Sequence, residues 1–236
     1  MKKPRFVNGY IYHIYNRGVE KRKIFLDKED YFRAVHDLFE FNDQNPALTL
    51  YYKQANFKSY EVQPHKIGKR EREPRKLLVK ILAFCLMPNH FHLLLQQVTN
   101  GGVIKFMQKL GTGYTMYFNQ RYERVGPLFQ GRFKAKLVNQ ESHLIHLPYY
   151  IHCNPLDLES PEWRKKEIKD YRKAVRFLEN YRWSSYPDYI GKKNFPSVTQ
   201  REFLLDFFNG TEQYKKDTLN WLKEFNLGEI EDVVIE

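Results

Sequence analysis

The sequence predicts an α+β protein in which helices pack on a mostly antiparallel sheet. Three observations predict this class. Short apolar or alternating runs are typical of strands, longer stretches with apolar residues three or four apart are typical of helices, and a proline turn at 87–89 joins two strands into a hairpin. The order of the elements suits helices that cover one or both faces of such a sheet.

The elements follow from these patterns in chain order. Strands are expected over 9–15, 48–53, 77–87, 89–97 and 134–139. Helices are expected over 27–42, 103–118, 141–154 and 218–225, with charged helical sequence at 164–180. Pro148 lies inside the third helix, and Pro155 ends it because proline disfavours further helix. Thr199 and Glu202 form the capping-box pattern, which predicts a further helix start.

The chain divides by pattern into a region 1–158 and a mostly helical C-terminal extension, 159–236. A polar stretch at about 54–76 is expected to form a basic loop or arm. A solvated loop and a contact with phosphate groups are equally good interpretations of this stretch. Its charged residues are Lys66, Lys69, Arg70, Arg72, Arg75 and Lys76, with Glu71 and Glu73 opposing them.

The composition is strongly basic. Among 236 residues, 39 Lys and Arg oppose 28 Asp and Glu, which gives a formal net charge of +11. This balance favours a polyanionic partner, usually a nucleic acid, although a solvated basic surface has the same composition. No apolar run approaches the roughly 18 residues of a membrane span, and the N-terminus lacks the apolar stretch of a signal peptide. Two cysteines without a paired pattern suit a reducing cytoplasm.

The strand at 89–97 carries two histidines in an unusual position. His90 and His92 flank one apolar residue, and side chains two apart in a strand share a face. The two imidazoles therefore lie about 7 Å apart along the strand and can hold a divalent metal. Taken alone, such a pair is more often a hydrogen-bonded structural pair than a metal site.

The helix before Pro155 supplies a candidate nucleophile. Tyr150 and Asn154 are four residues apart, so they project from one helical face. A tyrosine can attack a phosphodiester covalently, and a metal held by His90, His92 and Asn154 would stabilise the developing charge. Tyr149 adjoins Tyr150, and only its spacing from Asn154 makes it the weaker candidate. On the same helix, His143 and His146 are expected to be ordinary helix-surface residues.

Five motifs in a fixed order resemble one known family. They are YHIxNRG at 12–18, MPNHFHLL at 87–94, GxLFQGRF at 126–133, YIHxNP at 150–155 and WSSY at 183–186. Together they resemble the single-tyrosine HUH transposases, and among these the REP-associated tyrosine transposases. The resemblance covers roughly residues 5–190, and the ordered set is far more specific than any single motif.

The resemblance implies a ferredoxin-like sheet with the histidine pair on a central strand. It implies cleavage of single-stranded DNA at or near hairpins, with Tyr150 forming a 5′-phosphotyrosine and freeing a 3′-OH. His90, His92 and Asn154 would hold Mg²⁺ or Mn²⁺, and reversal by an incoming 3′-OH would rejoin strands. The basic stretch at about 54–76 resembles an insertion. A prokaryotic cytoplasmic protein, nucleoid-associated when bound to DNA and either monomeric or homodimeric, is expected.

Candidate contacts to DNA phosphates come from the basic residues of these motifs and of the polar stretch. They are Arg17, Lys69, Arg70, Arg72, Arg132 and Lys134. Two other functions remain open from the residues. One is a non-catalytic nucleic-acid-binding module that retains the fold. The other is a hydrolytic metalloenzyme without a covalent step, although the sequence lacks the acidic cluster that a two-metal site needs.

Overall fold

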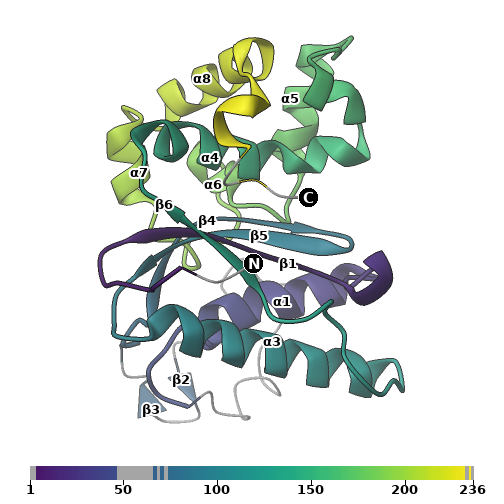
Figure 1. The fold of residues 1–236 in the computed structure, drawn as a ribbon, viewed down its shortest axis with the longest axis vertical. Coiled ribbons are helices and arrows are strands. Elements are labelled where there is room, and N and C mark those ends of the chain that lie inside the picture. The colour runs from purple at the N-terminus through teal and green to yellow at the C-terminus, as the bar shows by residue number, and fades with distance from the viewer. Residues whose placement is uncertain (1–3, 47–65, 68–69, 72–73, 232–233, 235–236) are drawn as a thin grey trace.

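A four-stranded antiparallel sheet forms the middle of the protein, with strand order β4-β5-β1-β6 (Figure 1). The computed structural model describes residues 4–46, 66–67, 70–71, 74–231 and 234. The strands are β1 (Ile11–Arg17), β4 (Val79–Met87), β5 (His90–Gln97) and β6 (Lys134–Val138). Helix α1 (Lys28–Glu40) joins β1 to β4, and α3 (Gly102–Arg121) joins β5 to β6. This order is the ferredoxin-like arrangement, so the predicted α+β class is confirmed.

The β4–β5 hairpin brings the histidine strand to the centre of the sheet. β5 pairs with β4 on one side and with β1 on the other. Both hairpin strands are almost entirely buried, which explains why β4 reads as a nearly continuous apolar run rather than as alternation. A short two-stranded ribbon, β2 (Lys66–Ile67) with β3 (Arg70–Glu71), lies apart from this sheet.

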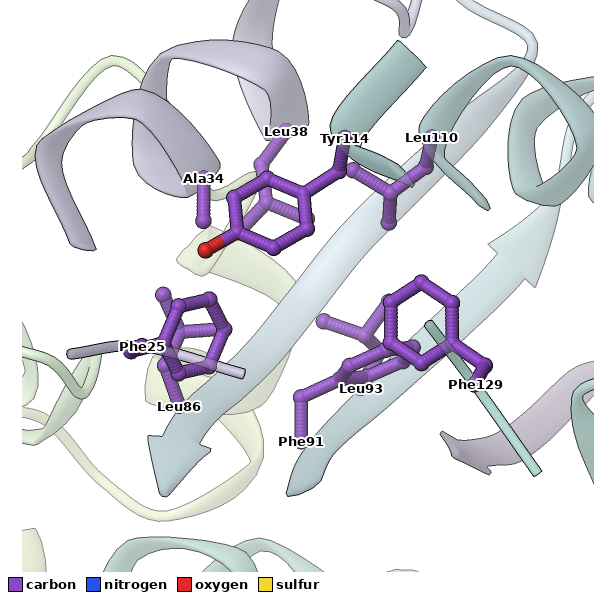
Figure 2. Close-up of a pocket in the computed structure, with 9 residues that line it drawn as sticks. All are labelled: Phe25, Ala34, Leu38, Leu86, Phe91, Leu93, Leu110, Tyr114 and Phe129. Carbon is purple, nitrogen blue, oxygen red and sulfur yellow. The ribbon is translucent and has the colours of Figure 1, made fainter. Parts of the chain in front are cut away.

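Helices α1 and α3 cover one face of the sheet (Figure 1). Apolar side chains from both helices, from the sheet and from two flanking loops converge between these layers (Figure 2). The space left among them is about 10 Å³, hardly room for one water molecule. They are Phe25, Ala34, Leu38, Leu86, Phe91, Leu93, Leu110, Tyr114 and Phe129. This layer is therefore packed as tightly as an ordinary protein interior.

The opposite face of the sheet is covered by α4 and by the C-terminal helices (Figure 1). Side chains of these helices share one buried cluster with residues of β4 and β5. The helices are α4 (Glu141–Cys153), α5 (Tyr171–Asn180), α6 (Tyr186–Tyr189), α7 (Glu202–Phe207) and α8 (Thr211–Glu224). Helix α4 runs through Pro148 without a break. The C-terminal extension is helical as predicted, whereas a domain boundary at residue 158 stays a prediction.

The WSSY segment covers the open edge of β4. Leu86 N donates to Trp183 O at 2.8 Å, and Ser185 N donates to Phe84 O at 3.0 Å. The Ser185 hydroxyl also accepts from Phe84 N at 2.9 Å. These bonds satisfy backbone groups that an edge strand would otherwise expose. Trp183 stacks on Tyr31 of α1 at 4.6 Å, so it packs the extension onto the sheet domain.

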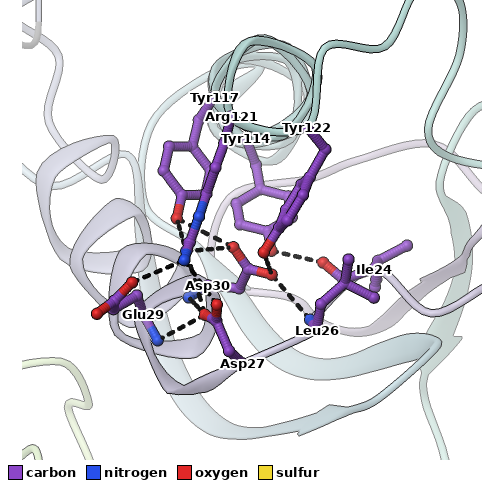
Figure 3. Close-up of polar contacts among 9 residues, drawn as sticks. All are labelled: Ile24, Leu26, Asp27, Glu29, Asp30, Tyr114, Tyr117, Arg121 and Tyr122. Atoms are coloured by element: carbon purple, nitrogen blue, oxygen red, sulfur yellow. Dashed lines mark hydrogen bonds and ion pairs between the residues drawn. The ribbon is translucent and has the colours of Figure 1, made fainter.

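A buried carboxylate ties the start of α1 to the end of α3 (Figure 3). Asp30 is fully buried and accepts from Arg121 at 2.9 Å, Tyr117 at 3.0 Å and Tyr122 at 2.8 Å. It also accepts from Leu26 N at 2.8 Å. All its lone pairs are thereby engaged, which makes its burial tolerable.

Several sequence predictions are corrected at the helix ends. The capping box at Thr199 is wrong, because the N-cap of α7 is Arg201 and the buried Thr199 hydroxyl makes no capping hydrogen bond. The charged stretch 164–180 is divided by a non-helical segment between the 3₁₀ turn η3 (Pro161–Lys165) and α5. Helix α8 begins well before the predicted residue 218.

The predicted strand 48–53 lies outside the described residues. Among the described residues, no helix has the length and apolarity to cross a bilayer.

We expect Asp30→Ala to lower the free energy of unfolding by about 3 kcal/mol, because it leaves two tyrosine hydroxyls and the Leu26 amide without their acceptor and removes one of the carboxylates that pair with Arg121. Urea denaturation measures this change. Glu29→Ala is the matched control, since Glu29 also pairs with Arg121 but its side chain is 75% exposed. That variant should lose less than about 1 kcal/mol. Equal losses in both variants would contradict the role of Asp30.

Candidate active site

The histidine strand presents its polar face to the α4 layer. Tyr15 and Arg17 of β1 lie directly opposite His92 and His90 in the antiparallel register, so their side chains share that face. The rings of His90 and His92 are 5.0 Å apart between centroids and nearly perpendicular. The other face of β5 carries the apolar Phe91, Leu93 and Leu95, which pack in the core with residues of α1 and α3.

Each histidine has one ring nitrogen engaged by a neighbour. His90 Nδ1 lies 2.7 Å from Asn89 Oδ1, and His92 Nδ1 lies 2.9 Å from Nε2 of the buried His13. When Nδ1 of a neutral imidazole carries the proton and donates it, Nε2 of the same ring keeps its lone pair and can bind a metal ion. Ligation through Nε2 of His92 therefore requires the tautomer in which His92 Nδ1 donates to His13. Such outer partners orient imidazoles at metal sites.

Burial keeps both imidazoles neutral. It lowers the pKa of His90 to about 4, although the Asp157 carboxylate and a hydrogen bond with Asn154 partly oppose the shift. Burial, followed by the proximity of His90 and His13, lowers the pKa of His92 well below its ordinary value. Neutral imidazole is the form that binds metal ions.

Helix α4 brings Asn154 and Tyr150 to this face. Asn154 hydrogen bonds with His90, and its Nδ2 donates to Tyr150 O at 2.8 Å. The Tyr150 ring meets the His92 ring edge-on at 5.8 Å. The four residues that the sequence singles out for a metal and a nucleophile thus lie together.

The neighbouring tyrosine points elsewhere. Tyr149 stacks on Tyr214 of α8 at 4.7 Å and on Trp221 at 5.9 Å. It belongs to the cluster between α4 and the C-terminal helices. One position along the helix turns the side chain by about 100°, which separates Tyr149 from the histidines.

Sequence reasoning missed two charged residues at the site, Asp157 and Arg164. Arg164, in η3, binds the Asp157 carboxylate through Nε at 2.9 Å and Nη2 at 2.7 Å. Its Nη1 lies 3.4 Å from the Tyr150 hydroxyl, and Nη2 lies 3.5 Å from Asn154 Oδ1. Burial opposes its charge, yet the bonds to Asp157 and Tyr150 raise the pKa of Arg164. Only their closeness to Pro155 in the sequence could have pointed to them.

Tyr150 is fully buried beneath η3. The Trp163 ring lies 6.1 Å from its ring, and the Arg164 guanidinium carbon lies 5.6 Å from the ring centroid. The candidate nucleophile is therefore covered in this conformation.

A basic cleft of about 360 Å³ opens beside the histidines. Its walls include both histidines, Asp157 and four cationic side chains. The cations are Arg17, Lys21, Arg132 and Lys134. Three of the six predicted DNA-contact residues, Arg17, Arg132 and Lys134, thus meet at one cleft. Lys69 and Arg72 lie outside the described residues, and only the backbone of Arg70 is described, in β3.

The GxLFQGRF and YHIxNRG motifs meet at the rim of this cleft. Arg17 Nε donates to the Gln130 side chain, and Asn16 Nδ2 donates to Gly131 O at 3.1 Å. Gly18 allows the turn, because a Cβ there would lie 2.3 Å from Arg22 O. The two motifs therefore build one rim from distant parts of the chain.

The remaining histidines of α4 lie away from the cleft. His152 is buried between the Tyr214 hydroxyl at 2.7 Å and Ser185 Oγ at 2.8 Å. His146 stacks on Phe225, and His143 is buried rather than surface-exposed, which corrects the expectation for that residue.

The donor set at the site is two imidazoles and one amide. Among the described residues, no group of three His, Cys, Asp or Glu is placed to hold a metal ion. His90, His92 and Asn154 nevertheless suit a divalent ion, because neutral nitrogen donors and a carbonyl oxygen converge there.

Comparison with known proteins finds a family match and a likeness to solved structures. Residues 53–154 match the family model of IS200-like transposases, a segment that contains His90, His92, Tyr150 and Asn154. This match confirms the family resemblance. A solved structure, described as a REP-associated tyrosine transposase bound to a REP hairpin, covers 84% of this chain and 89% of its own, with 10% identity and a TM-score of 0.45. No curated protein matches the chain significantly.

We expect acid to destabilise the fold through His152. Burial lowers its pKa to about 3, whereas an unfolded histidine titrates near 6.5. Between these values the unfolded chain binds a proton that the folded chain excludes, so stability is complete above pH 6.5 and falls with acidification. His152→Gln should therefore flatten the plot of unfolding free energy against pH by up to about 1.4 kcal/mol per pH unit. Urea denaturation between pH 6 and 4 measures this slope. The same slope in His152→Gln and in the wild type would contradict this interpretation.

Proposed function

We propose, from the match of residues 53–154 to the IS200-like transposases, that this chain cuts and rejoins single-stranded DNA through a covalent tyrosine. One observation carries the proposal. Tyr150 lies against His92, while Asn154 contacts His90, at the end of a cleft lined by four cations. A nucleophile, a metal-type donor set and a phosphate-binding surface thus share one site.

His90, His92 and Asn154 would hold Mg²⁺ or Mn²⁺. The bound ion would polarise a phosphate oxygen and stabilise the charge that builds up during displacement. His13 and Asn89 would hold the two imidazoles in the ligating tautomer and orientation.

Tyr150 would be the nucleophile. Its phenolic oxygen forms a bond to phosphorus while the bond from phosphorus to the 3′-oxygen breaks, which leaves a 5′-phosphotyrosine and a free 3′-OH. The phenol loses one proton and the departing 3′-oxygen gains one. Attack of a 3′-OH on the phosphotyrosine reverses these changes, so strands rejoin without an external energy source.

Arg164 would act on the nucleophile directly. Its guanidinium contacts the Tyr150 hydroxyl, and Asp157 holds it in place through two hydrogen bonds. A cation at this position favours negative charge on the phenolic oxygen as the proton leaves. Because Tyr150 is fully buried, the attack also requires η3 to withdraw far enough to admit a phosphate.

The cations of the cleft would hold the DNA backbone near the scissile bond. Arg17 and Arg132 come from the two motifs that share one rim, and Lys134 follows directly at the start of β6, so the three can act on neighbouring phosphates. Lys69, Arg70 and Arg72 would extend this contact from the basic stretch. A hairpin-containing single strand is the proposed partner, bound by a monomer or a homodimer, with the catalytic region in residues 1–158.

A non-catalytic DNA-binding protein is the alternative. The grouping of Tyr150, His90, His92 and Asn154 at one site argues against this alternative, because DNA binding alone does not require these side chains to lie together.

We expect Tyr150→Phe to abolish covalent attachment to DNA, because the variant keeps the ring but lacks the attacking oxygen. The assay incubates the protein with labelled hairpin oligonucleotides and Mn²⁺, then separates adducts on a denaturing gel. Tyr149→Phe is the matched control and should form adducts at the wild-type rate, since Tyr149 packs against α8. An adduct that persists in Tyr150→Phe would overturn the assignment of the nucleophile.

We expect His90→Ala to weaken Mn²⁺ binding by at least about 100-fold, because loss of outer partners alone costs 10–100-fold at metal sites. Isothermal titration calorimetry in the absence of DNA measures the affinity. His146→Ala serves as the control, since that residue contacts Trp221 and Phe225 away from the cleft. Equal affinity in His90→Ala and the wild type would exclude His90 as a ligand.

A further inference from the structure

Tyr15 of β1 is a side chain of the basic cleft to which the proposed function gives no role. It lines the cleft together with His92 and Lys134, and only 7% of its surface is exposed. Its hydroxyl oxygen is buried, and no described residue forms a hydrogen bond with it. A buried hydroxyl without a partner is costly, so such a group in a folded protein calls for an explanation.

The sheet places Tyr15 between a metal-type ligand and a cation. Strand β1 lies between β5 and β6, and Tyr15 is directly opposite His92 on one side and Lys134 on the other (Figure 1). Residues in such positions share a face, with Cβ atoms about 5 Å apart. The Tyr15 ring lies 6.0 Å from the His92 ring, and Lys134 Nζ lies 5.8 Å from the centre of the Tyr15 ring. A phosphate that bridges an ion on His92 and the charge of Lys134 therefore lies over Tyr15.

The chemistry of the cleft indicates which partner the Tyr15 hydroxyl would take. Arg17, Arg132 and Lys134 attract an anion, but their charged groups can only donate hydrogen bonds. A phenol also has one hydrogen to donate, and a phosphate oxygen is a strong acceptor for it. Tyrosine hydroxyls are among the groups that contact DNA phosphates in known complexes.

Tyr15 occupies the variable position of the YHIxNRG motif, so the family resemblance assigns it no role. The tyrosine that the motif does specify, Tyr12, faces the α1–α3 layer and has partners there. Its hydroxyl donates to Arg5 O at 3.0 Å and accepts from Val7 N at 2.8 Å. Two tyrosines of one strand thus differ in a testable way, because only the hydroxyl on the cleft side lacks a partner among the described residues.

We propose that the Tyr15 hydroxyl donates a hydrogen bond to a non-bridging oxygen of the phosphate that Tyr150 attacks. This inference rests on the proposed function, because it takes a DNA phosphate beside the histidines as the partner. The bond would orient the phosphate and stabilise the negative charge that its oxygens gain during displacement. Tyr15 and Tyr150 are both buried here, so the contact would form in the opened conformation that the attack already requires.

Tyr15→Phe removes the hydroxyl and keeps the ring. Urea denaturation of the free protein should show a stability equal to or above that of the wild type, because the variant removes a buried polar group that has no partner. The single-turnover rate of adduct formation at saturating hairpin oligonucleotide and Mn²⁺ should nevertheless fall by about 10- to 150-fold, the usual value of one hydrogen bond to a charged group.

Tyr12→Phe is the matched control. It should lower the stability of the free protein, because it removes two hydrogen bonds, and it should form adducts at the wild-type rate. A wild-type rate of adduct formation in Tyr15→Phe would overturn the inference, and so would a loss of stability in that variant as large as the loss in Tyr12→Phe.

A binding experiment separates this inference from the proposed chemistry. Each phosphate near the hairpin is replaced in turn by a methylphosphonate, which removes one charged oxygen, and affinity is measured with and without Tyr15→Phe in the Tyr150→Phe background. At one phosphate the two changes should be coupled, so that Tyr15→Phe weakens binding of the unmodified oligonucleotide by about 10-fold or more but barely weakens binding of the modified one.

The two readouts have distinct outcomes. Coupling at one phosphate without any adduct in the wild type would support the Tyr15 contact and contradict the covalent chemistry. Adducts in the wild type with equal effects of Tyr15→Phe at every phosphate would leave Tyr150 as the nucleophile and overturn the contact.

Discussion

The site depends on one constraint, the burial of strand β5 on both faces at the centre of the sheet. Alternation sends Phe91 and Leu93 to the α1–α3 layer and His90 and His92 to the other. A polar pair on a covered face must find partners, because an unpaired buried group costs about 1–3 kcal/mol. His13 of β1, Asn89 of the hairpin turn and Asn154 at the end of α4 supply them. The packing of α4 on the sheet therefore also completes the site.

The polar groups around His90 and His92 are linked by a series of hydrogen bonds. His13 and Asn89 engage one nitrogen of each ring, and Asn154 links His90 to α4. Arg164 brings a positive charge into this buried group, and the two bonds to Asp157 compensate its desolvation. Such a hydrogen-bonded arrangement suits the proposed role, in which the site would hold a phosphate and a phenol in line. Because η3 covers Tyr150, the proposed attack would require η3 to open first.

Most of this architecture follows from the sequence, because strand alternation and helical spacing are local properties. They predicted the hairpin and the shared face of His90 and His92, and the four-residue spacing brought Tyr150 and Asn154 to one face of α4. Arg164 could not be predicted in this way, since it lies in a 3₁₀ turn that has no periodic signal. The capping box at Thr199 failed because α7 begins only after Arg201, and the buried Thr199 hydroxyl caps no helix.

The central claim is that two histidines of β5 and a DNA phosphate share one divalent ion. Pulsed electron paramagnetic resonance of Mn²⁺ bound to the protein with a hairpin oligonucleotide tests it directly. The account predicts nitrogen couplings from two imidazoles together with phosphorus coupling from a directly bound phosphate. Phosphorus coupling without imidazole nitrogens would place the ion on the DNA alone and contradict the account.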